Sequence, residues 1–65
     1  MIVDAEGNEI RVGDSAYAVT PRHGLVMDFT GKVVEIREGT LEVAVKNDET
    51  DEIIWVPTNR VIGER

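Results

Sequence analysis

Residues 32–46 read Lys-Val-Val-Glu-Ile-Arg-Glu-Gly-Thr-Leu-Glu-Val-Ala-Val-Lys, and this stretch decides the fold class. Its first six residues are rich in β-branched side chains, which favour strands. Residues 38–40 suit a tight turn, and beyond it Leu41, Val43 and Val45 alternate with other residues so that one face is apolar. The stretch therefore predicts an antiparallel β-hairpin.

Outward from this hairpin, the rest of the chain repeats the same short-strand pattern. Strands are expected over residues 15–20, 52–56 and 60–62, and residues 57–59 suit one turn of 3₁₀ helix before the last of them. Pro21 is expected to end the first of these strands, because proline supplies no N–H to a ladder. No segment keeps a helical period over the length that a helix needs, so an all-β domain is predicted.

The N-terminus adds a small hairpin to this pattern. Residues 1–4 and 10–12 are strand-like, and the Ala-Glu-Gly-Asn-Glu between them suits a turn, since Gly and Asn tolerate positive φ. A chain of 65 residues makes one domain. We therefore expect a single domain over residues 1–65, with a hairpin over 1–12 and the core of a barrel over 13–63.

Composition excludes several classes of protein. The chain has no cysteine and one histidine, so disulfides, thiolate metal sites and any site that needs two histidines are ruled out. Thirteen acidic against seven basic residues give a formal charge of −6, which disfavours binding to nucleic-acid phosphates. Apolar runs are short and the first residues lack the features of a signal peptide, so we expect no membrane segment and a cytoplasmic location.

The order of the expected elements resembles the SH3-like barrel. Residues 56–61, Val-Pro-Thr-Asn-Arg-Val, resemble the stretch that closes SH3 domains, in which a hydrophobic residue and proline precede Asn, Tyr and Val. Gly-Asp at 13–14, followed by Gly-Lys-Val at 31–33 and the alternating residues 41–45, resembles the KOW-type motif of ribosomal proteins and transcription elongation factors. The resemblance covers roughly residues 12–62. It implies a small barrel of five to six short strands, with an N-terminal hairpin and a 3₁₀ turn before the last strand.

Each resemblance implies a function, and the chain departs from both families. SH3 domains bind proline-rich peptides on a floor of aromatic residues. The Tyr of their closing stretch is Arg60 here, and only Pro57 and Asn59 carry over. KOW domains that bind RNA carry basic loops, whereas residues 48–52 are mostly acidic. A nucleic-acid role would depend on scattered basic residues, namely Arg11, Arg22, Lys32 and Arg60.

Trp55 is the first candidate for a binding residue. If its two chain neighbours face the core, alternation turns Trp55 outward beside Pro57, where it would serve as a binding anchor. The alternative is that Trp55 covers an open end of the barrel. Tyr17 would likewise point outward from between two inward alanines. The predicted partner-binding residues are Trp55, Tyr17 and Pro57, with Phe29 and Arg60 at the rim.

Residues 21–31 contain two glycines and a proline and are expected to be the longest irregular stretch. They also contain the apolar residues Leu25, Val26, Met27 and Phe29. These side chains either form a flap over the core or dock on a partner. We expect the flap, because a chain this short needs every buried side chain that it can find.

Neither a catalytic site nor a metal site is expected, and no cofactor is implied. His23 lies in the long stretch. Carboxylates and a serine are present in the chain, but their spacing from His23 matches no catalytic triad or dyad. The acidic residues 48–52 lack the spacing of a calcium loop, so a solvated turn is expected there.

The resulting hypothesis is a non-enzymatic interaction module that binds a protein partner, or a second copy of itself, through an aromatic surface patch. Self-association would also stabilise a thin core. Short stand-alone barrels of this kind resemble accessory proteins of bacteria and their phages. Two alternatives stay open, a KOW-like nucleic-acid or ribonucleoprotein-associated domain and an enzyme whose site is assembled across an oligomer.

Overall fold

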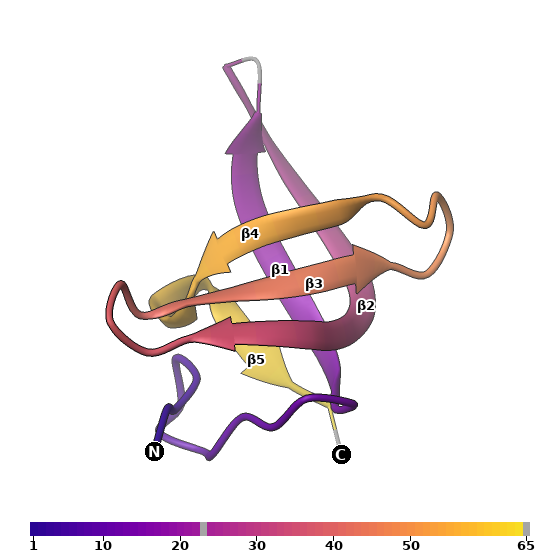
Figure 1. Cartoon of the computed structure of the whole chain (residues 1–65). Coiled ribbons are helices and arrows are strands. Elements are labelled where there is room, and N and C mark those ends of the chain that lie inside the picture. Colours follow the sequence, from indigo (N-terminus) through magenta and orange to yellow (C-terminus); the bar gives the residue numbers. More distant parts are fainter. Residues whose placement is uncertain (23, 65) are drawn as a thin grey trace.

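The computed structural model describes residues 1–22 and 24–64 and shows five antiparallel strands with one 3₁₀ turn (Figure 1). In chain order the elements are β1 (Ser15–Arg22), β2 (Leu25–Arg37), β3 (Glu42–Asn47), β4 (Ile53–Pro57), the 3₁₀ turn η1 (Thr58–Arg60) and β5 (Val61–Gly63). The predicted all-β class and the 3₁₀ turn before the last strand are confirmed. Among the described residues, no helix is long and apolar enough to cross a bilayer.

The strands form one sheet in the order β4-β3-β2-β1-β5. Because β2 is long and bends, it runs through two crossing layers, first beside β1 and then beside β3 (Figure 1). The register of β2 shifts between Val33 and Glu35, and such a bulge increases local twist. β4 and β5 are the two ends of the sheet and do not pair with each other, so the sheet is not closed and the expected barrel is not confirmed.

The core lies between the two layers. Alternation directs one side chain in two inward along each strand, and small or β-branched residues fill the narrow space. The predicted hairpin over residues 32–46 forms, but Leu41 does not share its apolar face. Leu41 instead ends the β2–β3 turn with a φ of 55° and is exposed. The buried strand residues of the core are Ala16, Ala18, Val33, Val43, Val45, Val56 and Val61.

The N-terminal segment completes this core. Ile2 and Ile10 are both buried in the core cluster. The predicted N-terminal hairpin is reduced to a single bridge, Val3↔Glu9, and forms no named strand. Such a short hairpin gains its stability from packing against the sheet, since an isolated one is marginal in water.

Asp4 holds this segment against β5. Its buried carboxylate accepts hydrogen bonds from the backbone N–H groups of Glu6 and Asn8, at 2.9 and 3.0 Å, and of Gly63, at 2.8 Å. The N–H of Ala5 also donates to a carbonyl of β5 at 2.9 Å. A carboxylate is tolerated in a buried position when such donors satisfy it, so Asp4 links the two ends of the chain.

The stretch expected to be irregular is a paired hairpin. β1 continues through Pro21, which lies opposite Val26, and Gly24 turns with a φ of 79°. Pro21 does not break the pairing, because Val33 donates to the carbonyl of Asp14 at 2.9 Å and alternation then directs the backbone of Pro21 away from β2. Past the last partner of β5, the hairpin continues as a free two-stranded arm (residues 19–22 and 24–28; Figure 1).

Candidate functional site

Trp55 lies on the outer face of β4, the position that alternation gives it when both of its chain neighbours face the core. Val56 is buried and Ile54 packs against the core, so alternation directs Trp55 outward. Its cross-strand neighbour is Ala44, and the guanidinium of Arg37 stacks over the indole with Cζ 4.1 Å from the ring centroid. A cation over an aromatic face is attracted by the ring quadrupole. Trp55 is therefore half-covered by a side chain of the same molecule.

Two of the other predicted residues follow Trp55 along the chain. Pro57 ends β4 and is exposed, and Arg60 is exposed in η1. Trp55 and Pro57 thus belong to β4, an end strand of the described sheet, and Arg60 follows in the turn that leads to β5.

Tyr17 lies in the other layer of the molecule. Its cross-strand neighbours are Thr30 of β2 and Ile62 of β5, and its hydroxyl donates to Oδ2 of Asp28 at 2.7 Å. The neighbours of Trp55 are Ala44 of β3 and Arg37 at the end of β2, and two strands separate β4 from β1 in the sheet order. The structure therefore does not join Tyr17 and Trp55 in one patch.

The contact between Tyr17 and Asp28 gives a direct test in solution. The hydrogen bond and the negative charge of Asp28 raise the pKa of Tyr17 above its ordinary value of 10.0. The uncharged phenol is favoured in the fold, so the contact stabilises the protein below pH 10 and is lost as the pH rises through the raised pKa. We expect ultraviolet titration of the single tyrosine to give a pKa above 10 in the wild type and a lower pKa in Asp28→Asn. Identical pKa values would show that the contact is absent in solution.

Phe29 packs against the core opposite Ala18, whereas Arg60, the other predicted rim residue, is exposed. With Met27 and Ile54, Phe29 also lines a groove of about 100 Å³ between the arm and the β3–β4 turn. Pockets for small-molecule ligands are roughly 300 Å³ or larger. This groove has room for a side chain of a partner.

The expected flap over the core is wrong for the first residues of β2. Leu25, Val26 and Met27 are 69%, 74% and 49% exposed. The reason is that the turn at Gly24 lies beyond the reach of β5, so the arm projects from the sheet and Phe29 is the first of its apolar residues to return to the core. Leu25, Val26 and Met27 together are called the apolar tip below.

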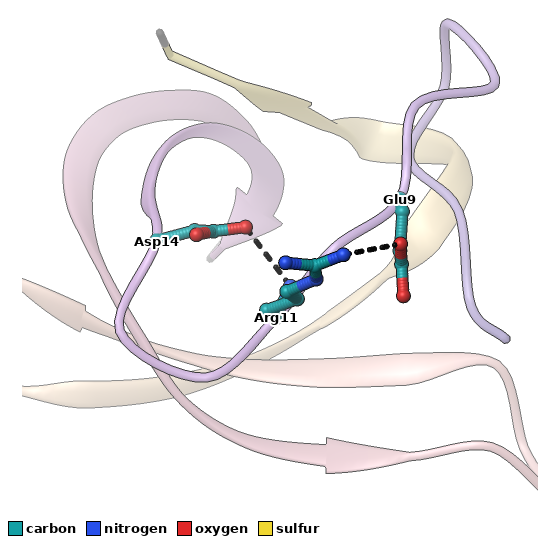
Figure 2. Close-up of polar contacts among 3 residues, drawn as sticks. All are labelled: Glu9, Arg11 and Asp14. Atoms are coloured by element: carbon teal, nitrogen blue, oxygen red, sulfur yellow. Dashed lines mark hydrogen bonds and ion pairs between the residues drawn. The ribbon is translucent and has the colours of Figure 1, made fainter.

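A hollow of about 540 Å³ lies between residues 7–14 and the ends of β1 and β5. Figure 2 shows Arg11 between two carboxylates. Its Nη2 donates to Oε1 of Glu9 at 3.0 Å, which raises the pKa of Arg11, and its backbone N–H donates to Oδ2 of Asp14 at 2.9 Å. Asp14 returns a bond from its N–H to the carbonyl of Arg11 at 3.1 Å. These groups brace a turn and do not form a nucleophile with an adjacent base.

The remaining sequence candidates offer no assembled chemistry. His23 lies outside the described residues, as does the side chain of Arg22. In the part of the chain that the structure describes, no three His, Asp or Glu side chains gather as metal ligands. In the acidic turn, Asn47 Oδ1 accepts the N–H of Glu49 at 2.8 Å, and Lys46 Nζ lies 3.9 Å from Asp51 Oδ1.

Comparison with known protein families, with curated proteins and with solved structures finds no match to this chain. Only the geometry and chemistry of the chain itself therefore bear on its function.

Proposed function

We propose that this chain is a non-enzymatic interaction module that binds a protein partner through the apolar tip of its arm. The observation that carries the proposal is the exposure of Leu25, Val26 and Met27, which are consecutive and lie on a projecting hairpin. Single exposed apolar residues are ordinary on a small protein, but a contiguous group on a projection is typical of an interaction site. A partner with an apolar groove would bury these side chains.

The charge distribution supports the same surface. The chain carries a formal charge of −6, yet no acidic residue occurs between Asp14 and Asp28. At the base of the arm, Asp28 accepts a hydrogen bond from Tyr17. The tip therefore lacks the negative charge that other surfaces of the molecule carry. An acidic partner can approach the tip without the electrostatic repulsion that it would meet at those surfaces.

We also infer that the two layers pack as in an SH3-like barrel that stays open along the outer edge of β4. The antiparallel order, the 3₁₀ turn between β4 and β5, and contacts between β1 and β4 support this arrangement. Small barrels host many activities, so this inference about the fold does not select a function.

Two exposed valines allow a matched test of the proposed surface. Val26→Asp places a charge at the centre of the apolar tip, whereas Val12→Asp places the same charge in the turn before β1, where Val12 is 62% exposed. With the wild-type chain as bait in extracts of its source cells, we expect a stoichiometric protein partner. Val26→Asp should weaken its binding by about tenfold or more, as for a residue central to an interface.

Thermal unfolding of both variants should match the wild type, because neither valine is buried. Full retention of the partner by Val26→Asp, or equal loss with Val12→Asp, would rule out the apolar tip as the binding surface.

A further inference from the structure

The two edges of the sheet differ in what lies beside them. The outer edge of β5 is covered by the N-terminal segment, since Ala5 donates to the carbonyl of Val61 at 2.9 Å and Gly63 donates to Oδ2 of Asp4 at 2.8 Å. β4 is the other end of the sheet, and no described strand pairs along its outer side. An uncovered edge offers backbone donors and acceptors to another strand.

The groups on this open edge follow from the ladder between β3 and β4. Asn47 donates to the carbonyl of Glu52 at 2.8 Å, and the register that follows contains no shift. Every second residue after Glu52 therefore bonds to β3, and the N–H and C=O groups of Ile53 and Trp55 point to the free side. Pro57 adds a carbonyl without an N–H, so the open edge is short and has two donors.

We propose that this edge pairs antiparallel with the same edge of a second copy of this chain. A twofold axis makes such an interface self-complementary, because each copy supplies the same donors and acceptors. Pairing would place the outer-face side chains of both β4 strands side by side. Among them Ile53 is 55% exposed and Pro57 is exposed, so apolar surface would be buried along with the backbone bonds.

Charge complementarity favours a second copy as the occupant. In two antiparallel registers, the outward N–H groups of Ile53 and Trp55 both meet β4 of the second copy. One register places Trp55 opposite Trp55, and the other places Ile53 opposite Trp55. In both, the end of β4 that leads into η1 meets the beginning of β4 in the other copy. Arg60 of each copy then lies by the acidic turn 48–52 of the other, which contains Asp48, Glu49 and Asp51. Opposite charges at matching positions select this orientation over the parallel one.

The dimer is expected to be weak. A pair of five-residue strands buries less than the roughly 1,200 Å² of a standard interface, and each copy carries a charge of −6. This surface is separate from the apolar tip, so its failure would leave the proposed function standing.

Sedimentation velocity from roughly 10 μM to 1 mM, the range in which weak interfaces associate, tests the proposal. We expect the wild type to form a dimer within this range. Ile53→Pro removes an outward N–H and no bond to β3, so it should weaken the dimer by about tenfold, while Ile53→Thr, which keeps the N–H, should weaken it less. A melting curve of each variant shows whether the fold is retained.

The charge pair gives a test that does not alter the strand. Arg60→Glu should weaken the dimer severalfold, and adding Glu49→Lys should restore it, since both side chains are exposed. A wild type that stays monomeric at the highest concentration overturns the proposal. So does a dimer that resists Ile53→Pro and Arg60→Glu, or one that only Val26→Asp disrupts. If Ile53→Pro does not fold, Arg60→Glu and the double variant that adds Glu49→Lys test the proposal without it.

Discussion

Gly31→Ala is expected to remove a large part, or all, of the stability of this protein. Gly31 is buried in β2 and lies between Ala16 of β1 and Asn47 of β3. A Cβ at this position would fall on the carbonyl oxygen of Lys46 and lie 2.7 Å from its carbonyl carbon, with Val45 Cγ1 at 2.9 Å. Lys46 belongs to β3, which is paired on both sides, so its backbone has no room to move aside.

The expected cost of Gly31→Ala exceeds that of ordinary overpacking. Inserting a methyl group among side chains costs about 1–3 kcal/mol. Here the clash is with backbone, so we expect more than about 4 kcal/mol. A domain of this length has a total stability of roughly 3–10 kcal/mol. The change therefore removes a large part of the stability, and all of it at the lower end of that range.

Circular dichroism and amide NMR spectra would check this prediction. Gly39→Ala is the matched control, because a Cβ at Gly39 meets nothing within 4 Å. The control should lie within about 0.5 kcal/mol of the wild type. A folded Gly31→Ala protein with the unfolding midpoint of Gly39→Ala would show that β2 and β3 do not approach each other this closely.

Asp4→Ala is expected to cost about 2–3 kcal/mol of unfolding free energy. The substitution leaves the backbone N–H groups of Glu6, Asn8 and Gly63 without their carboxylate partner. Unsatisfied buried donors cost about 1–3 kcal/mol each, and water can reach some of these after the change. The loss should also loosen the N-terminal segment from β5, because Asp4 is its side-chain link to Gly63.

Urea unfolding followed by the fluorescence of Trp55, the single tryptophan, measures this effect. Glu6→Ala is the control, since it removes an exposed carboxylate from the same turn and keeps the backbone N–H that donates to Asp4. The control should change stability by less than about 0.5 kcal/mol. If Asp4→Ala and Glu6→Ala unfold at the same urea concentration, the buried carboxylate does not hold the two ends together.

Local patterns in the sequence predicted what depends on neighbours along the chain. The alternation of Val43 and Val45 predicted a strand that turns both valines to the core, and alternation predicted an outward Trp55 if Ile54 and Val56 face the core. Both are confirmed. Leu41 does not follow the same alternation, because it ends the turn with a positive φ. An apolar residue gives no indication of this backbone conformation in the sequence.

The arm could not be predicted from local patterns. Glycine and proline usually indicate an irregular loop, and the same residues here lie in a paired hairpin. Pro21 fits there since its missing N–H faces outward, and that depends on the register between β1 and β2. The absence of acidic residues between Asp14 and Asp28 was a usable signal for the arm, because it sets this segment apart from an otherwise acidic chain.

The all-β class and the central hairpin could be predicted from the amino-acid sequence, because strand period and turn chemistry act over a few residues. For Trp55, alternation left two positions open, one on the outer face and one over an open end of the barrel. Other features appear only in the folded chain: Tyr17 and Trp55 lie apart, Asp4 reaches Gly63 and the apolar tip projects. The N-terminal segment covers one sheet edge, and no described strand pairs along the outer side of β4. These features depend on which distant segments pair and in which register. That choice is made by the packing of the whole core.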